Sequence, residues 1–221
     1  MRRALSFIVP IAFVLVVVFV PGGRLDFPRA WALLAFLALC GLAQRLYVAA
    51  RNPTLFAARA TIGEGTPRFE YAWSPLWWLF LFSEGGVAGV QLLRFDVEPW
   101  PWWTAIPGAT LIALGFALSA RSMAENPHFE GTVRIQRDRG HRVIDTGPYR
   151  VVRHPGYVGL ILWALGQPLV LGSSWALVPA VIATSWVIVR TRFEDDFLRR
   201  GLDGYEAFTQ RTRYRLLPGV W

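Results

Sequence analysis

The sequence predicts an all-α, polytopic membrane protein with about six transmembrane helices and a C-terminal helical hairpin. Hydrophobic residues make up 54% of the 221 residues, the mean hydropathy is +0.36, and the chain contains 11 tryptophans. These values are too apolar for an ordinary soluble domain of this length. The charged residues also lie mainly between long apolar runs, which is the arrangement that a membrane-spanning chain requires.

Each apolar run approaches the roughly 20 residues with which a helix crosses a bilayer. The runs comprise residues 5–20, 30–50, 73–93, 106–123, 157–171 and 175–189. The first run follows a basic start and resembles a secretory signal, but no small-x-small cleavage site comes after it, so we expect an uncleaved helix. The polar connection between the second and third runs contains Pro53, Gly63, Gly65 and Pro67, which argue against regular structure there.

The third run is interrupted near its middle by Ser83, Glu84, Gly85 and Gly86. An ionisable residue inside a membrane is costly and usually functional, so one interpretation is that Glu84 faces a cavity. The other is a bent or broken helix that lets Glu84 reach water or an arginine. The sequence leaves both open.

The distribution of arginine predicts the topology. The chain has a net charge of +8 and no lysine, and all but three of its arginines fall on one side of six alternating spans. The exceptions are Arg24, Arg29 and Arg94. The positive-inside rule therefore places both termini, the long loop at 124–154 and the tail in the cytoplasm, with the chain in the inner (cytoplasmic) membrane. Because the arginines flank apolar runs, this charge indicates a lipid bilayer as partner and no nucleic acid.

Metal and disulfide chemistry have little support. Cys40 is the single cysteine, and His128, His141 and His154 are scattered without cysteine partners, so no metal site is expected. The dinucleotide-binding, P-loop, zinc-protease and serine-hydrolase motifs are absent from the sequence.

The most informative stretch is the junction DTGPYRVVRHPGYVGLILW at 145–163, where a basic segment becomes an apolar helix. Pro155 suits the first position of a helix, and Arg153 and His154 precede it. Free backbone N–H groups and the helix dipole would add to this positive charge, which makes the junction a candidate site for a carboxylate or phosphate.

A short turn at Gly172–Ser174 forces the last two runs into an antiparallel hairpin. This hairpin should bring Arg153 and His154 beside the acidic cluster of Glu194, Asp195 and Asp196. Such a mixed-charge site suits a zwitterionic ligand. The alternative is a solvated helix face, because Asp195 with Arg199 and Asp196 with Arg200 have the favourable i, i+4 order.

The runs TGPYRVVRHPGYVG and RFEDDFLRRGLDGYEAF, with the closing RLLPGVW, resemble the isoprenylcysteine carboxyl methyltransferase family and the wider group that includes phospholipid methyltransferases. The resemblance covers about the last half of the chain. It implies a single integral membrane methyltransferase domain at 1–221, with generic spans at 1–100 and the catalytic core at 106–221. It also implies a cytoplasmic pocket for S-adenosyl-L-methionine and a lipophilic or membrane-resident methyl acceptor.

The resemblance assigns catalytic roles to Arg153, His154 and Glu194. It implies that the cofactor pocket is formed by Gly147, Tyr149, Arg153, His154, Pro155, Tyr157, Gly159, Glu194 and Asp195. Asp195 departs from the family pattern, which usually has Glu at that position. Arg153, His154 and the helix N-terminus would hold the cofactor carboxylate, and Glu194 its ammonium or ribose hydroxyls. If the acceptor is an amine, His154 is instead the natural general base.

Five functions remain open on the sequence. Carboxyl O-methylation is the activity that the family most resembles, and the alternatives within the group are N-methylation of a phospholipid amine and S-methylation of a small thiol. A membrane reductase that uses NADPH is a more distant alternative, because sterol reductases have a similar C-terminal hairpin. A non-catalytic transporter or scaffold has some support from Glu84, but no internal repeat is visible.

Overall fold

The computed structural model describes residues 2–60, 63, 66 and 70–221, apart from the side chains of residues 2–10, 72 and 74. The α-helices are α1 (Arg2–Phe19), α2 (Pro28–Arg51), α3 (Leu55–Arg59), α4 (Glu70–Gly89), α5 (Ala105–Glu125), α6 (Pro155–Leu171), α7 (Leu177–Gly201) and α8 (Tyr205–Arg211). A π-helix at Val90–Arg94 follows α4, and 3-10 turns occupy Trp102–Thr104, Arg137–Arg139 and Gly147–Arg150. The described residues contain no strand, which confirms the all-α prediction.

Within the described residues, three helical segments are long and apolar enough to cross a bilayer. They are Pro28–Arg51, Pro75–Arg94 and Trp102–Glu125. The next most apolar helix, α6, has 17 residues. The chain is thus an integral membrane protein of helical type, whereas the count of about six spans stays a prediction.

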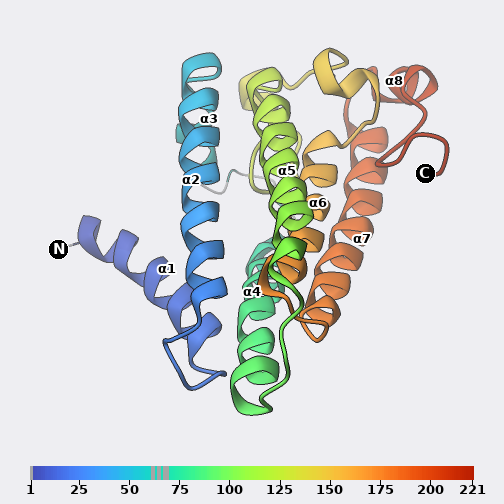
Figure 1. The fold of residues 1–221 in the computed structure, drawn as a ribbon. Helices are drawn as coiled ribbons and strands as arrows, with labels where there is room; N and C mark the ends of the chain where they lie inside the picture. Colours follow the sequence, from blue (N-terminus) through green and yellow to red (C-terminus); the bar gives the residue numbers. More distant parts are fainter. Residues whose placement is uncertain (1, 61–62, 64–65, 67–69) are drawn as a thin grey trace.

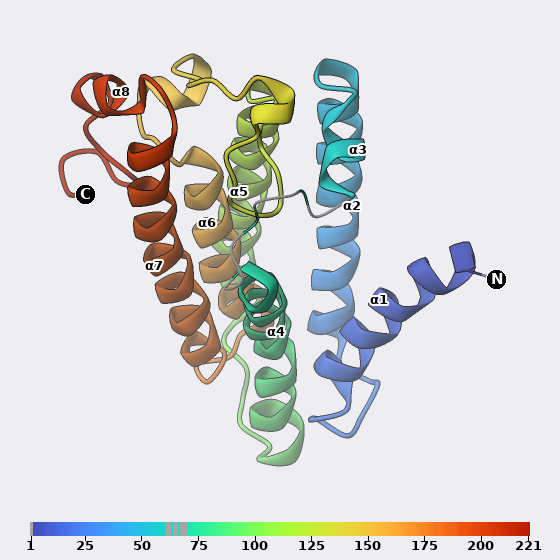
Figure 2. The same cartoon turned by 180° about the vertical axis from the view of Figure 1, so that it is seen from behind.

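The helices form one bundle around a shared core. In Figure 1, α2, α5, α6 and α7 run side by side, and α1 leans away from them towards the N-terminus. Seen from behind in Figure 2, α4 crosses in front of α5 and α6. Buried hydrophobic side chains from α1, α2, α4, α5, α6 and α7 meet in the interior. The loop between α5 and α6 and helix α8 lie together at one end of the bundle (Figure 1).

Helices α5 and α6 pack against each other through glycines. A Cβ added to Gly159 would lie 2.5 Å from the carbonyl oxygen of Gly115, and a Cβ on Gly115 would lie 2.5 Å from that of Gly159. Gly108 and Gly166 repeat this reciprocal contact further along, at 2.7 and 2.6 Å. Small residues let two helix backbones approach closely, which is a common solution in membranes. The pairing fixes the beginning of α6 against α5.

The predicted hairpin of α6 and α7 is confirmed. Gly172 ends α6 in the left-handed conformation (φ 71°), which glycine adopts without steric cost. The side-chain oxygen of Gln91 then accepts hydrogen bonds from Ser173 Oγ (2.6 Å) and Trp175 N (3.1 Å). Helix α7 continues well past the apolar run, to Gly201, and carries the acidic cluster towards the α6 N-terminus.

Two expectations about irregular structure are wrong. Helix α4 is continuous through Ser83–Gly86, because its two glycines pack against α1 instead of breaking the helix. Glu84 is fully buried and does not line the large cavity described below. The connection between α2 and α4 contains the short helix α3, although Gly65 and Pro67 lie outside the described residues.

Candidate functional site

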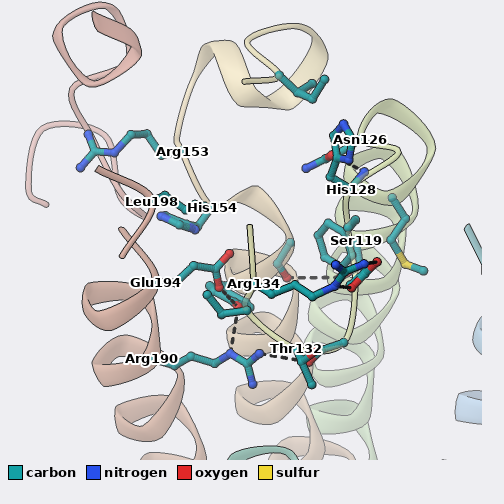
Figure 3. A pocket seen from close by; sticks show the side chains of 18 of the residues that line it. Ser119, Asn126, His128, Thr132, Arg134, Arg153, His154, Arg190, Glu194 and Leu198 are labelled. Atoms are coloured by element: carbon teal, nitrogen blue, oxygen red, sulfur yellow. Dashed lines mark hydrogen bonds and ion pairs between the residues drawn. The ribbon is translucent and has the colours of Figure 1, made fainter. Parts of the chain in front are cut away.

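A cavity of about 380 Å³ opens inside the end of the bundle where α6 begins. Its walls come from the loop after α5, the N-terminus of α6, the charged half of α7, and α8 (Figure 3). Small-molecule pockets usually have volumes of roughly 300–1,000 Å³. The cavity therefore has room for a ligand of nucleoside size.

The junction that the sequence singled out forms one wall. His154 is the N-cap of α6 and Pro155 occupies its first turn, as predicted. The C-terminal tail holds this junction from outside, since Arg153 N donates to Tyr214 O (2.9 Å) and His154 N donates to Arg215 O (3.0 Å). The tail thus pairs with the backbone immediately before α6, which leaves the first turn of α6 to face the cavity.

Arg153 and Asp195 form a buried, bidentate ion pair. Arg153 Nε and Nη2 lie 2.7 and 2.9 Å from the two carboxylate oxygens, and Arg215 Nε lies 2.9 Å from Oδ2. His154 Nε2 and the Tyr205 hydroxyl lie 3.3 and 3.0 Å from Oδ1. Burial alone would raise the pKa of the Asp195 carboxyl, but hydrogen bonds from His154 and Arg153 and their charges hold that pKa well below its usual value. Asp195 is therefore an ionised, fully buried anchor.

Glu194, one residue earlier, faces the cavity. Its Oε2 accepts a hydrogen bond from the Tyr157 hydroxyl, and Arg190 Nε donates to the same hydroxyl oxygen at 2.9 Å. Arg190 also donates to Glu70 Oε2 (2.8 Å) and Gly131 O (3.1 Å). Figure 3 shows Glu194 and Arg190 on successive turns of α7, both directed towards the cavity. The wall thus carries a carboxylate and a guanidinium side by side.

The opposite wall is the loop between α5 and α6. It contributes Asn126, His128 and Thr132, which lie across the cavity from His154 and Glu194 in Figure 3. His141 also lines the cavity, and its ring centroid lies 4.6 Å from that of His128.

The third part of the lining is aromatic and apolar. Side chains of the apolar helices continue the cavity into the bundle, namely Trp73, Trp77, Trp78, Met123, Leu160, Trp163 and Val187. Trp163 packs edge-on against Trp77 and Trp78, with ring centroids 5.7 Å apart in both pairs. The cavity therefore has a polar end with charges of both signs and an aromatic end at the depth of the apolar helices.

The structure brings most of the predicted site residues together, in different roles. Tyr149, Arg153, His154, Tyr157 and Glu194 line the cavity. The Arg153 guanidinium turns away from the cavity, as Figure 3 shows, and its Nε donates to Asp195 Oδ1. The remaining predicted residues lie behind the wall: Pro155 in the first turn of α6, Gly159 against α5, Asp195 under the junction, and Gly147 in a turn with φ 55° beside Glu125.

Sequence reasoning missed four cavity or support residues: Glu70, His128, His141 and Arg190. Arg190 precedes Glu194 by four positions, so the shared helix face was a usable signal. Glu70 begins α4 and reaches Arg190 from 120 residues away, which no local pattern reveals. The two histidines were considered only as metal ligands.

Comparisons with known proteins find similarity to one group of enzymes. Residues 103–203 match the family described as phospholipid methyltransferase. The chain is 28% identical over 101 residues to protein-S-isoprenylcysteine O-methyltransferase B of Arabidopsis thaliana, covering 45% of this chain and 51% of that protein. It is 28% identical over 117 residues to the Homo sapiens protein-S-isoprenylcysteine O-methyltransferase, covering 47% and 39%. The chain thus spans about half or less of the length of these relatives. The matches confirm the resemblance to this group of membrane methyltransferases.

Proposed function

We propose that the chain is an S-adenosyl-L-methionine-dependent membrane methyltransferase that transfers a methyl group to the carboxylate of a lipophilic acceptor. The observation that carries this proposal is the two-ended cavity, which joins a mixed-charge polar end to an aromatic end among apolar helices. The names of the relatives support O-methylation, and the phospholipid methyltransferase match keeps a lipid amine as the second candidate.

The polar end fits the proposed cofactor by its donor set. The cofactor carries a carboxylate, an ammonium, ribose hydroxyls, an adenine ring and a sulfonium. Glu194 offers its second carboxylate oxygen, Oε1, which bonds to no other described residue. The Phe208 ring and the apolar side chains of Ile144 and Leu198 suit a purine ring. Glu194 would hold the ammonium or a ribose hydroxyl, and the N-terminus of α6 beside His154 would hold the carboxylate.

The chain's own groups then act by position and charge. When bound, the cofactor supplies an electrophilic methyl group. Transfer of this group requires the acceptor atom to lie in line with the breaking bond between the methyl carbon and the sulfonium sulfur. Holding two reactants in such geometry lowers a reaction barrier by about 7–11 kcal/mol. Tyr157 and Arg190 fix the Glu194 carboxylate from one side, and the Trp77 and Trp163 rings offer an apolar surface for the acceptor chain. The Arg190 guanidinium, between these two parts, would attract an acceptor carboxylate.

The identity of the acceptor decides the role of His154. A carboxylate acceptor needs no general base, whereas an amine must lose a proton before or during transfer. His154 Nε2 already lies 3.3 Å from Asp195 Oδ1 and 3.4 Å from the Tyr205 hydroxyl. A positioning role at the cofactor predicts that His154→Ala abolishes cofactor binding. A general-base role predicts intact binding with slower turnover.

The last part of the proposal is the orientation of the chain in the membrane. The arginine distribution supports an orientation in which the polar end of the cavity and both termini lie at the cytoplasmic face of the inner membrane. The cofactor would enter from the cytoplasm and the acceptor from the bilayer. Labelling of cysteines introduced one at a time at Asp203 and at Asp96 into a Cys40→Ser chain, in intact cells, tests this orientation.

The decisive test is calorimetric binding to the detergent-purified full chain. S-Adenosylmethionine and S-adenosylhomocysteine should bind, and Glu194→Gln should weaken both because it removes the negative charge without changing the shape of the side chain. Glu206→Gln is the matched control, since Glu206 is 62% exposed on α8. Binding of NADPH alone would replace this function with a reductase, and no binding to folded protein would refute it.

A further inference from the structure

The loop between α5 and α6 holds a pair of histidines whose environment defines their protonation. The rings of His128 and His141 are inclined at 35°, and both side chains line the cavity. His128 is buried, with 8% of its surface exposed. Their Nδ1 atoms both contact Gln136, one through its side chain and the other through its backbone.

Gln136 fixes the tautomer of His128. The Gln136 amide nitrogen donates to His128 O at 2.7 Å, so its oxygen faces the other way and accepts from Arg139 Nη1 at 2.9 Å. That same oxygen lies 3.3 Å from His128 Nδ1. An amide oxygen has no hydrogen to donate, so His128 Nδ1 must carry the proton. Neutral His128 consequently presents an unprotonated Nε2.

His141 adopts the opposite tautomer. The backbone N–H of Gln136 donates to His141 Nδ1 at 3.2 Å, so this nitrogen is an acceptor and the ring proton sits on Nε2. Burial lowers the pKa of both rings, and the neighbouring His128 helps to bring the pKa of His141 to about 4. Both histidines are therefore neutral at physiological pH.

The pair thus offers one acceptor and one donor. Neither Nε2 atom has a hydrogen-bond partner in the part of the chain that the structure describes. A carboxylate or phosphate would require two donors. The edge of an adenine ring, in contrast, has a donor in its exocyclic N6 amine and an acceptor in N1 next to it. Val143 and Ile144, which follow His141 in the sequence, add apolar surface to the same wall.

We propose that His128 and His141 recognise the adenine ring of the cofactor, with His128 Nε2 accepting from N6–H and His141 Nε2–H donating to N1. This inference rests on the proposed function. It names the part of the cofactor site that selects adenine over other nucleobases. Gln136 acts as a positioning residue, because its three hydrogen bonds hold the two rings in opposite tautomers.

The test compares S-adenosylhomocysteine with S-inosylhomocysteine by calorimetry on the detergent-purified full chain. Inosine has a carbonyl at position 6 and a proton on N1, so it reverses both hydrogen bonds. The unaltered chain should prefer the adenosyl ligand by roughly a hundredfold or more, because a site built for given donors and acceptors strongly rejects their reversal. His128→Phe and His141→Phe should each reduce this preference below about tenfold.

Arg137→Ala is the control variant, because Arg137 is exposed in the same loop. The 1-deaza analogue of S-adenosylhomocysteine, which lacks the N1 acceptor, repeats the test on the unaltered chain in case a histidine variant does not fold. Equal affinity for the deaza and natural ligands would overturn the inference.

5′-Methylthioadenosine separates this role from carboxylate binding, since it keeps the adenine and lacks the amino acid. Its affinity should fall in both histidine variants. Unchanged affinity for it, or full adenosyl preference in folded variants, would refute adenine recognition. Failure of the unaltered chain to bind any adenosyl ligand would refute the proposed function itself.

Discussion

Arg153 and Asp195 are joined by two hydrogen bonds of 2.7 and 2.9 Å, between side chains that are 2% and 0% exposed. Arg153 Nη1 also donates to Thr212 O and Arg213 O. One guanidinium therefore connects the segment before α6, the C-terminal part of α7 and the C-terminal tail. These contacts of Arg153 are structural. The groups that the Arg153–Pro155 junction offers to a ligand in the cavity are therefore His154 and the N-terminus of α6.

This geometry predicts a large stability loss for Asp195→Ala. The variant leaves Arg153 and Arg215 buried or half-buried without their carboxylate, and breaking a buried ion pair by removing one partner costs about 3–5 kcal/mol. Thermal unfolding in detergent measures the effect. Asp196→Ala is the control, because that side chain is 43% exposed and lies 3.8 Å from Arg215. Equal melting temperatures for the two variants would contradict a structural role for Asp195.

A second prediction concerns Tyr157, which donates to Glu194 while accepting from Arg190. Tyr157→Phe should weaken S-adenosylhomocysteine binding by roughly three- to tenfold, the equivalent of one ordinary hydrogen bond. The melting temperature should change little, since the ring packing is kept. Tyr71→Phe on the exposed face of α4 is the matched control. Undiminished binding would mean that Glu194 does not depend on Tyr157 for its orientation.

The sequence was sufficient for the parts of this site that follow local rules. Pro155 marked the first turn of α6, the three-residue turn after Leu171 required a hairpin, and the hairpin placed Asp195 beside Arg153 and His154. The i, i+4 pairing of Asp195 with Arg199 also occurs, at 3.5 Å. In contrast, the expected partner of Asp196 was Arg200, whereas the structure pairs it with Arg215 from the tail.

The parts that could not be predicted depend on contacts between distant segments. Glu70 meets Arg190 across the bundle, and the tail carbonyls of Thr212 and Arg213 meet Arg153. Helix periodicity identifies an apolar face but does not say which helix covers it. For the same reason, a break at Gly85 and Gly86 stayed open as one of two interpretations, although these glycines are sites of close approach to α1.

A third prediction follows from the depressed pKa of His141, which burial and the neighbouring His128 lower to about 4. The unfolded ring titrates near 6.5, so the unfolded chain binds more protons between these values. Stability should therefore be complete above about pH 6.5 and decrease as the pH falls towards 4. Glu130, Arg134, Arg139 and Arg142 also surround the two rings.

Melting temperatures measured from pH 7.5 to 4 test this dependence. The double variant His128→Phe/His141→Phe should have a flatter profile, because it removes both lowered imidazole pKa values. Asp195 does not contribute in this window, since its lowered pKa makes its stabilisation complete above about pH 4 and lost only below it. If the melting temperature of the double variant fell with pH as steeply as that of the unaltered chain, the acid sensitivity would belong to other groups.

The last prediction links helix packing to the cavity. Gly159→Ala would place a methyl group 2.5 Å from Gly115 O and 2.6 Å from Ser119 Oγ, so α6 must move away from α5. Overpacking of this kind costs about 1–3 kcal/mol. Gly41→Ala on α2 is the matched control, because its nearest neighbour would be Phe116 at 3.9 Å and alanine favours the helix. Since α6 carries Tyr157 and His154 is its N-cap, displacement of α6 should also weaken S-adenosylhomocysteine binding. Lowered stability with unchanged binding would show that the α6 N-terminus is positioned by the tail alone.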